Sequence, residues 1–91
     1  MTTVDNDNDL WMTALGEIET KVPKPIFETW LKFPKTRGKF FSETVFIIET
    51  QDAFISEYLE TRMYAVISET LQKLIKKEVE IKFNVFGVAF T

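Results

Sequence analysis

Two residue types that carry much of protein chemistry are missing from this chain, which has no cysteine and no histidine. Without cysteine there is no disulfide, thiol nucleophile or thiolate metal ligand. Without histidine there is no Ser-His dyad, imidazole zinc ligand or histidine proton shuttle near neutral pH. We therefore expect a protein that is not an enzyme and that binds no metal or cofactor.

Glycine and long apolar runs are also scarce. The three glycines, Gly16, Gly38 and Gly87, do not fall in the spacing of a phosphate-binding P-loop. The longest apolar runs, residues 45–48 and 85–90, are far shorter than the roughly 20 residues of a membrane-spanning helix. The chain does not open with a basic region followed by an apolar stretch, as a secretory signal does. These features predict a cytoplasmic protein with no membrane segment.

Apolar and aromatic residues are plentiful. The 91 residues are 45% hydrophobic and include nine Phe, two Trp and two Tyr, which is enough material for one core and too much for a disordered chain. The first eight residues are short, polar and acidic, and we interpret residues 1–8 as a flexible acidic tail. Residues 9–86 are expected to form a single domain, followed by an apolar C-terminal extension at residues 87–91.

The charges of the chain are segregated. Residues 21–39 carry six basic side chains against Glu28 alone, whereas residues 43–60 carry five acidic side chains and no base. Segregation of this kind concerns surfaces and binding partners more than the fold.

The hydrophobic periodicity changes several times along the chain. Apolar positions at helical spacing, proline positions and alternating stretches predict the following elements: a helix at 9–21, a helix at 25–32 that begins with Pro25, two strands and a turn within 36–50, a long helix at 52–76 and a strand at 78–85. The order ααββαβ predicts an α+β domain in which a three-stranded sheet packs against helices. The direction of the last strand relative to its neighbour is left open by the pattern.

Several stretches resemble the N-terminal domain of DnaA, the bacterial chromosomal replication initiator. They are Leu10-Trp11, Ala14-Leu15, residues 24–32, Ala53-Phe54, residues 58–64 and residues 78–83, so the similarity spans about residues 9–86. The resemblance implies a fold similar to KH domains. It also implies a domain that binds proteins, namely itself, the replicative DnaB-type helicase and initiation regulators, with weak single-stranded DNA contact in some members. Ile26 departs from the pattern because some members carry there an acid implicated in helicase contact, and that contact is not carried over.

Phe54 is the strongest candidate for a partner contact. On a helical wheel it points roughly opposite the apolar stripe that contains Ile55 and Leu59, and exposed aromatic residues are frequent interface anchors. The resemblance matches Phe54 to a partner-contacting phenylalanine. The alternative is that Phe54 tucks under the preceding strand. The expected partner-binding residues are Phe54, Asp52, Ile55, Glu57 and Tyr58.

The first helix carries a candidate self-association site. The resemblance matches Trp11, beside Leu10, to a tryptophan that the initiator uses to associate with itself, and implies a weak homodimer. The wheel direction of Trp11 lies near the centre of the apolar stripe, which favours the core instead. Trp30, among Phe27, Leu31 and Phe33, is expected in the core.

A second class of function is a small KH-like module that binds single-stranded nucleic acid. The basic residues Lys32, Lys35, Arg37 and Lys39 are interleaved with aromatic residues, as in single-strand binders. Against this reading, the chain is acidic overall and Gly38 is the only glycine near the place where a KH domain would need a GXXG loop. A third hypothesis is a stand-alone protein that competes with an initiator for shared partners.

Overall fold

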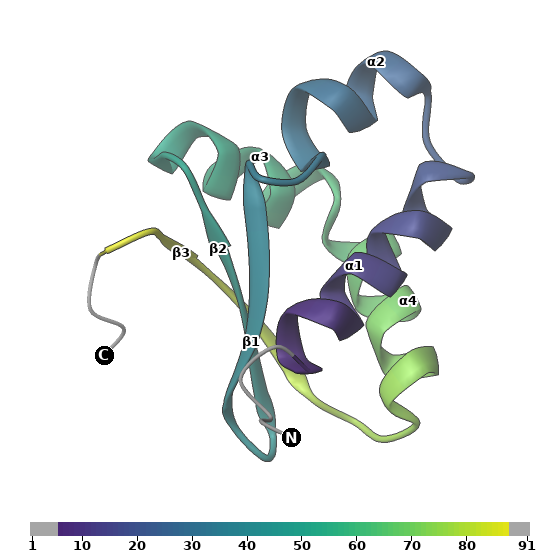
Figure 1. The fold of residues 1–91 in the computed structure, drawn as a ribbon, viewed down its shortest axis with the longest axis vertical. Coiled ribbons are helices and arrows are strands. Elements are labelled where there is room, and N and C mark those ends of the chain that lie inside the picture. The colour runs from purple at the N-terminus through teal and green to yellow at the C-terminus, as the bar shows by residue number, and fades with distance from the viewer. Residues whose placement is uncertain (1–5, 88–91) are drawn as a thin grey trace.

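A computed structural model describes residues 6–87 and shows an α+β domain, which confirms the fold class expected from the sequence (Figure 1). Its elements in chain order are α1 (Asn6–Glu19), α2 (Lys24–Ile26), the π-helix η1 (Phe27–Leu31), β1 (Thr36–Ser42), β2 (Val45–Thr50), α3 (Ala53–Arg62), α4 (Tyr64–Ile75) and β3 (Glu80–Val85).

The sheet has the order β1-β2-β3, with β2 in the centre. β1 and β2 form an antiparallel hairpin whose register runs from Thr36 opposite Thr50 to Phe40 opposite Phe46, followed by an irregularity before Ser42. β3 runs parallel to β2, from Glu80 beside Val45 to Val85 beside Thr50. The two helices between β2 and β3 supply the long crossover that a parallel pair requires, which settles the direction left open by the sequence.

The core lies between the helices and one face of the sheet. In Figure 1, α1 and α4 lie on the same side of the strands. Alternation along β2 directs Phe46 and Ile48 toward the helices, where they join a buried cluster with Trp11, Leu59 and Leu71. Gly38 is required by this packing, because a Cβ there would lie 2.6 Å from Trp11 Cβ and 2.7 Å from Phe46 Cζ.

The single long helix predicted at 52–76 is wrong, because the chain forms α3 and α4 with a break at Met63. Met63 leaves the helical region with φ −118° and ψ 1°. After the break, Ile67 is buried, whereas its neighbour Val66 is only partly buried. With the break, α3 packs on β3 and α4 packs on α1.

The proposed boundary of the acidic tail also needs correction. α1 begins at Asn6, so residues 6–8 belong to the folded domain. Asp7 and Asn8 accept hydrogen bonds from the backbone of β1, which holds the first turn of α1 against the sheet. The rest of the predicted tail and residues 88–91 of the predicted C-terminal extension lie outside the described residues.

Candidate functional site

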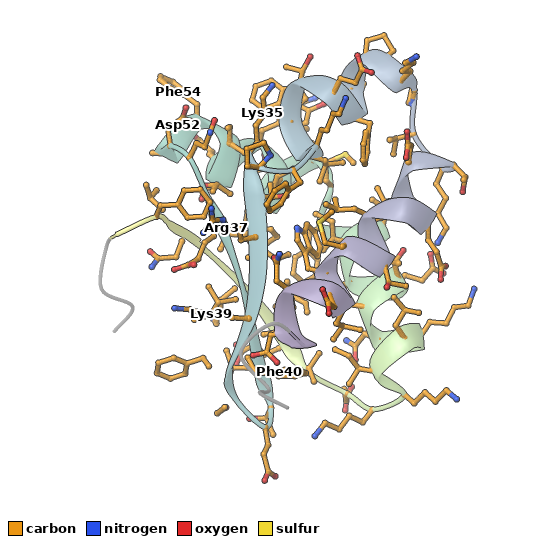
Figure 2. All side chains as sticks on the ribbon, viewed as in Figure 1. Lys35, Arg37, Lys39, Phe40, Asp52 and Phe54 are labelled. Carbon is orange, nitrogen blue, oxygen red and sulfur yellow. The ribbon has the colours of Figure 1, made fainter. Side chains whose placement is uncertain are left out.

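Phe54 is the most exposed large hydrophobic residue in the described part of the chain, with 79% of its surface accessible. It is the second residue of α3, two positions after the helix N-cap Asp52. The Asp52 carboxylate accepts a hydrogen bond from the backbone N–H of Ile55 at 3.0 Å, which fixes the first turn of the helix. Phe54 therefore projects from an ordered turn at one end of the molecule (Figure 2). The outward direction expected from the helical wheel is confirmed.

A shallow groove of about 250 Å³ adjoins Phe54 between η1 and α3. Its wall is an aromatic stack in which the rings of Trp30 and Tyr58 lie 4.0 Å apart and 10° from parallel. The groove is lined by Trp30, Phe54, Glu57, Tyr58, Thr61 and Arg62. An apolar wall flanked by one acidic and one basic side chain suits a peptide or protein surface with an apolar anchor and charged neighbours.

The predicted partner-binding residues do not all reach this surface. Phe54 and Glu57 are exposed, and Tyr58 is partly buried as part of the groove wall. Asp52 is exposed but serves as the helix cap. Ile55 is only 7% exposed and belongs to the core, so its place in the predicted contact set is wrong. Phe54 and Ile55 are consecutive residues, and they point in different directions because successive helical residues are rotated by about 100°.

Three residues that line the groove were not among those predicted from the sequence. Trp30 was expected in the core, but it is only partly buried and its ring stacks on Tyr58. Thr61 and Arg62 come from the end of α3. The spacing of Phe54, Tyr58 and Thr61 at three to four residues along one helix was a usable signal, whereas the approach of Trp30 from η1 was not.

The placement of Trp11 removes the predicted self-association surface. Its side chain is 0% exposed, and its indole Nε1 donates to Thr36 Oγ1 at 2.9 Å. A side chain with no accessible surface cannot contact a second copy of the folded chain, so Trp11 acts as a core residue here. Leu10 is partly buried and packs against the same core.

The four basic residues proposed for nucleic acid do not line one groove. Lys35 donates to the carbonyl oxygens of Glu28 and Thr29 at 2.8 and 3.0 Å, at the end of η1. Arg37 and Lys39 project from the other side of the sheet, away from α1 and α4 (Figure 2). Lys39 pairs with Glu49 at 3.4 Å. Lys32 is exposed beside a different hollow.

Arg37 lies near two aromatic rings on this face of the sheet. Its guanidinium carbon lies 5.8 Å from the ring centre of Phe33 and 5.3 Å from that of Phe86. Both distances are within the range of cation–π attraction.

On β3, Lys82 pairs with Glu80 at 3.0 Å. The hydrogen bond to Glu80 is the larger cause, and the negative charge of Glu80 the second, of a raised pKa of Lys82. Lys82 therefore remains a cation at neutral pH.

A second apolar hollow lies between α1 and η1. It has a volume of about 350 Å³ and is lined by Met12, Leu15, Gly16, Glu19, Phe27, Lys32 and Phe33. Met12 and Phe33 are among the exposed large hydrophobic residues. No pattern in the sequence had indicated this hollow.

The chain matches no protein-family model. Between residues 6 and 87 there is no cluster of three or more acidic side chains that could hold a metal ion. In the same segment no helix has the length and apolar character needed to cross a membrane.

Proposed function

We propose that this chain is a protein-interaction module that binds its partner over Phe54 and the adjoining groove between η1 and α3. The observation that carries the proposal is the 79% exposure of Phe54 on an ordered, capped helix turn. A large apolar side chain on a backbone turn that is already ordered needs little further backbone ordering when a partner covers it, which suits an interface anchor.

The resemblance to the DnaA N-terminal domain supports a specific class of partner. We infer that the partner is a replicative DnaB-type helicase or a regulator of initiation. Phe54 lies between Asp52 and Glu57, both exposed acidic side chains, so the matching surface should carry basic residues around an apolar pocket. Such charges guide encounter and orientation more than they add affinity.

The test is binding of the full chain to a purified replicative helicase by surface plasmon resonance. Phe54→Ala should weaken binding by about 30-fold or more, the effect of losing an interface hot spot. The matched control is Phe41→Ala, because Phe41 is also an exposed phenylalanine but lies on the β1–β2 hairpin.

Two results would count against the proposal. Equal affinity of Phe54→Ala and the unmodified chain would remove Phe54 from the interface. Equal weakening by Phe54→Ala and Phe41→Ala would show a nonspecific effect of surface hydrophobicity. Because Phe54 is mostly solvated, its substitution should leave the thermal melt almost unchanged, so loss of fold is not a confounding cause.

One observation favours a second candidate function, contact with single-stranded nucleic acid. On the sheet face opposite α1 and α4, Arg37 lies near the rings of Phe33 and Phe86, and Lys39 and Lys82 add two further cations, each paired with a glutamate. Single-strand binders combine cationic and aromatic side chains. Filter binding to an oligothymidine at low and moderate salt tests it. Binding that weakens with salt and is lost in Arg37→Ala supports it, and no binding at low salt eliminates it.

A further inference from the structure

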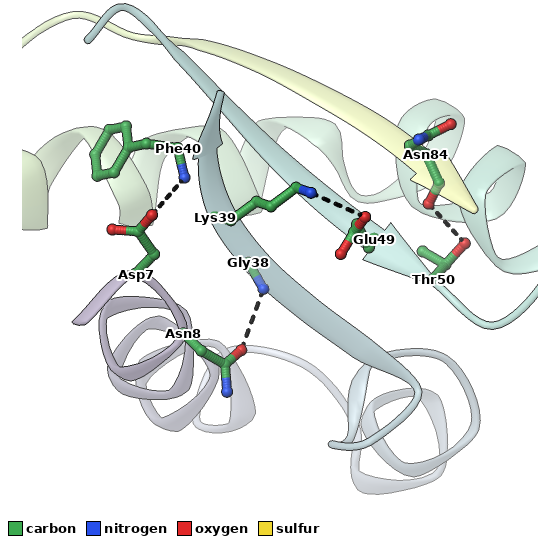
Figure 3. A network of polar contacts seen from close by, with 8 residues as sticks. All are labelled: Asp7, Asn8, Gly38, Lys39, Phe40, Glu49, Thr50 and Asn84. Carbon is green, nitrogen blue, oxygen red and sulfur yellow. Dashed lines mark hydrogen bonds and ion pairs between the residues drawn. The ribbon is translucent and has the colours of Figure 1, made fainter. Parts of the chain in front are cut away.

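The two edges of the sheet differ in whether side chains accept hydrogen bonds from their outward backbone N–H groups. At the β1 edge, the backbone N–H of Gly38 donates to Asn8 Oδ1 at 3.2 Å and that of Phe40 donates to Asp7 Oδ2 at 2.9 Å (Figure 3). Side chains from the first turn of α1 thus occupy donors that would otherwise pair with a foreign strand. Covering an edge in this way is a common protection against strand addition.

Among residues 6–87, no side chain caps the outward backbone donors of β3 in the same way. The backbone N–H groups of Glu80 and Phe86 donate to Thr44 and Thr50, beside β2, at 2.7 and 2.8 Å. Because backbone groups alternate in direction along a strand, those of Ile81, Phe83 and Val85 point away from β2. Within the described residues these three N–H groups have no hydrogen-bond acceptor.

The open stretch has a defined beginning. The backbone N–H of Val79 donates to Gln72 Oε1 at 2.9 Å, and the Val79 carbonyl accepts from Gln72 Nε2 at 3.2 Å. The side chain of Gln72, from α4, therefore closes the edge just before β3. The segment left to pair is Ile81–Val85, whose central residue is Phe83.

We propose that a second copy of this chain adds its own β3 antiparallel to this edge, with a two-fold axis through Phe83. In that register Ile81 faces Val85 of the other copy and Phe83 faces Phe83, so all three outward-pointing positions pair and apolar side chains meet on the helix-covered side. On the open face Lys82 faces Asn84. A two-fold arrangement is the usual symmetry of a homodimer.

The register centred on Lys82 is disfavoured by two features of the chain. Centring the pairing on Lys82 would place two ammonium groups opposite each other, and like charges at facing positions destabilise a strand pair. It would also need the backbone groups of Val79, which Gln72 already holds. The arrangement centred on Phe83 avoids both conflicts.

Apolar surface beside the β3 edge also favours pairing with β3 of a second copy. The ring of Tyr64, at the start of α4, lies 6.5 Å from that of Phe83 and is inclined at 61° to it. Tyr64 is 41% exposed, and in the dimer it would lie near the incoming Phe83.

Five residues per copy make a small interface, so the dimer is expected to be weak and concentration-dependent. This dimer does not require a partner at Phe54.

Charge variants at Asn84 test the register. Asn84→Lys would place a cation opposite Lys82 twice in the dimer, and Asn84→Glu would place an anion there. We expect Asn84→Lys to raise the dimer dissociation constant and Asn84→Glu to lower it, each by roughly 2- to 30-fold for two facing pairs. Sedimentation equilibrium of the full chain over a wide concentration range measures both. The double variant Lys82→Glu/Asn84→Lys restores opposite charges and should associate at least as well as the unmodified chain.

The fold itself provides an internal control. Within one copy, Asn84 lies beside Glu49 of β2, so Asn84→Lys should hold or raise the thermal melt and Asn84→Glu should lower it slightly. Stability and association are therefore expected to change in opposite directions. Hydrogen exchange offers a second readout, because the amides of Ile81, Phe83 and Val85 should exchange more slowly as concentration rises.

Three results would overturn the proposal. The first is a monomer at every accessible concentration. The second is a dimer whose dissociation constant is the same in both Asn84 variants, which would locate self-association elsewhere. The third is concentration-dependent protection that is absent from Ile81, Phe83 and Val85.

Discussion

The indole N–H of Trp11 donates to the hydroxyl of Thr36 at 2.9 Å, and the same hydroxyl donates to the carbonyl oxygen of Leu31 at 2.7 Å. Trp11 and Thr36 are both fully buried. One hydroxyl group thus serves as acceptor and donor in the core and joins α1, β1 and the end of η1. A buried polar group without a hydrogen-bond partner destabilises the fold, so these two hydrogen bonds favour this one placement of the Trp11 ring over others in the core.

Thr36→Val should lower the free energy of unfolding by about 2–4 kcal/mol, because it leaves the Trp11 N–H and the Leu31 carbonyl unsatisfied while keeping the side-chain shape. Urea denaturation measures the change. Thr36→Ser keeps the hydroxyl and should cost clearly less. Equal losses in the two variants would mean that packing of the methyl group, and not the hydrogen bonds, is what matters at this site.

Gly38→Ala should destabilise the fold by about 2 kcal/mol or more, since the added methyl group would overlap Trp11 Cβ and the ring of Phe46. Gly16→Ala is the matched control. Gly16 lies within α1 and a Cβ there meets no atom within 4 Å, so alanine should stabilise the helix by about 0.5–1 kcal/mol. Thermal melts that fail to move in opposite directions would contradict the packing described around Gly38.

Asp52→Ala should lower stability by about 1 kcal/mol through loss of the hydrogen bond to the N–H of Ile55. Asp52→Ser retains a capping oxygen without the charge and should recover most of that loss in a thermal melt. If a basic partner surface is also attracted to the Asp52 carboxylate, Asp52→Ser should still associate with the partner more slowly than the unmodified chain at low salt. A serine variant that melts like the alanine variant would argue against the capping role.

Lys76→Gly should stabilise the chain by about 0.5–1 kcal/mol. Lys76 ends α4 in the left-handed region with φ 66° and ψ 29°, a conformation that glycine adopts without the steric cost of a Cβ. Lys77→Gly is the control, because Lys76 is the only non-glycine residue with a positive φ between residues 6 and 87. A gain in melting temperature for Lys77→Gly as large as that for Lys76→Gly would contradict the assignment.

Local features of the fold were predictable from the sequence. Pro25 stands in the first turn of α2 as expected, the aromatic and β-branched residues at 36–50 form the hairpin, and the alternation at 78–85 forms β3. Each depends on interactions between residues close in sequence. The outward direction of Phe54 was predictable for the same reason, because it follows from helix geometry alone.

Features that depend on distant residues were not predictable. The periodicity continues through Met63, so nothing local marks the break that lets α3 and α4 pack on different elements. Trp30 has an apolar neighbourhood typical of the core, and only the approach of Tyr58 turns it into a groove wall. Trp11 could be assigned to the core or to an interface until Thr36, 25 residues away, was seen to satisfy its N–H.

The first turn of α1 sets a limit on how far the chain can be shortened for laboratory work. Residues 1–8 have the composition of a dispensable leader, and trimming them is a natural way to prepare a smaller sample. Asp7 and Asn8, however, occupy the outward donors of Phe40 and Gly38. A version that starts at Asp9 would expose a second unprotected strand edge. It is expected to precipitate or form mixed oligomers under conditions in which the longer chain does not.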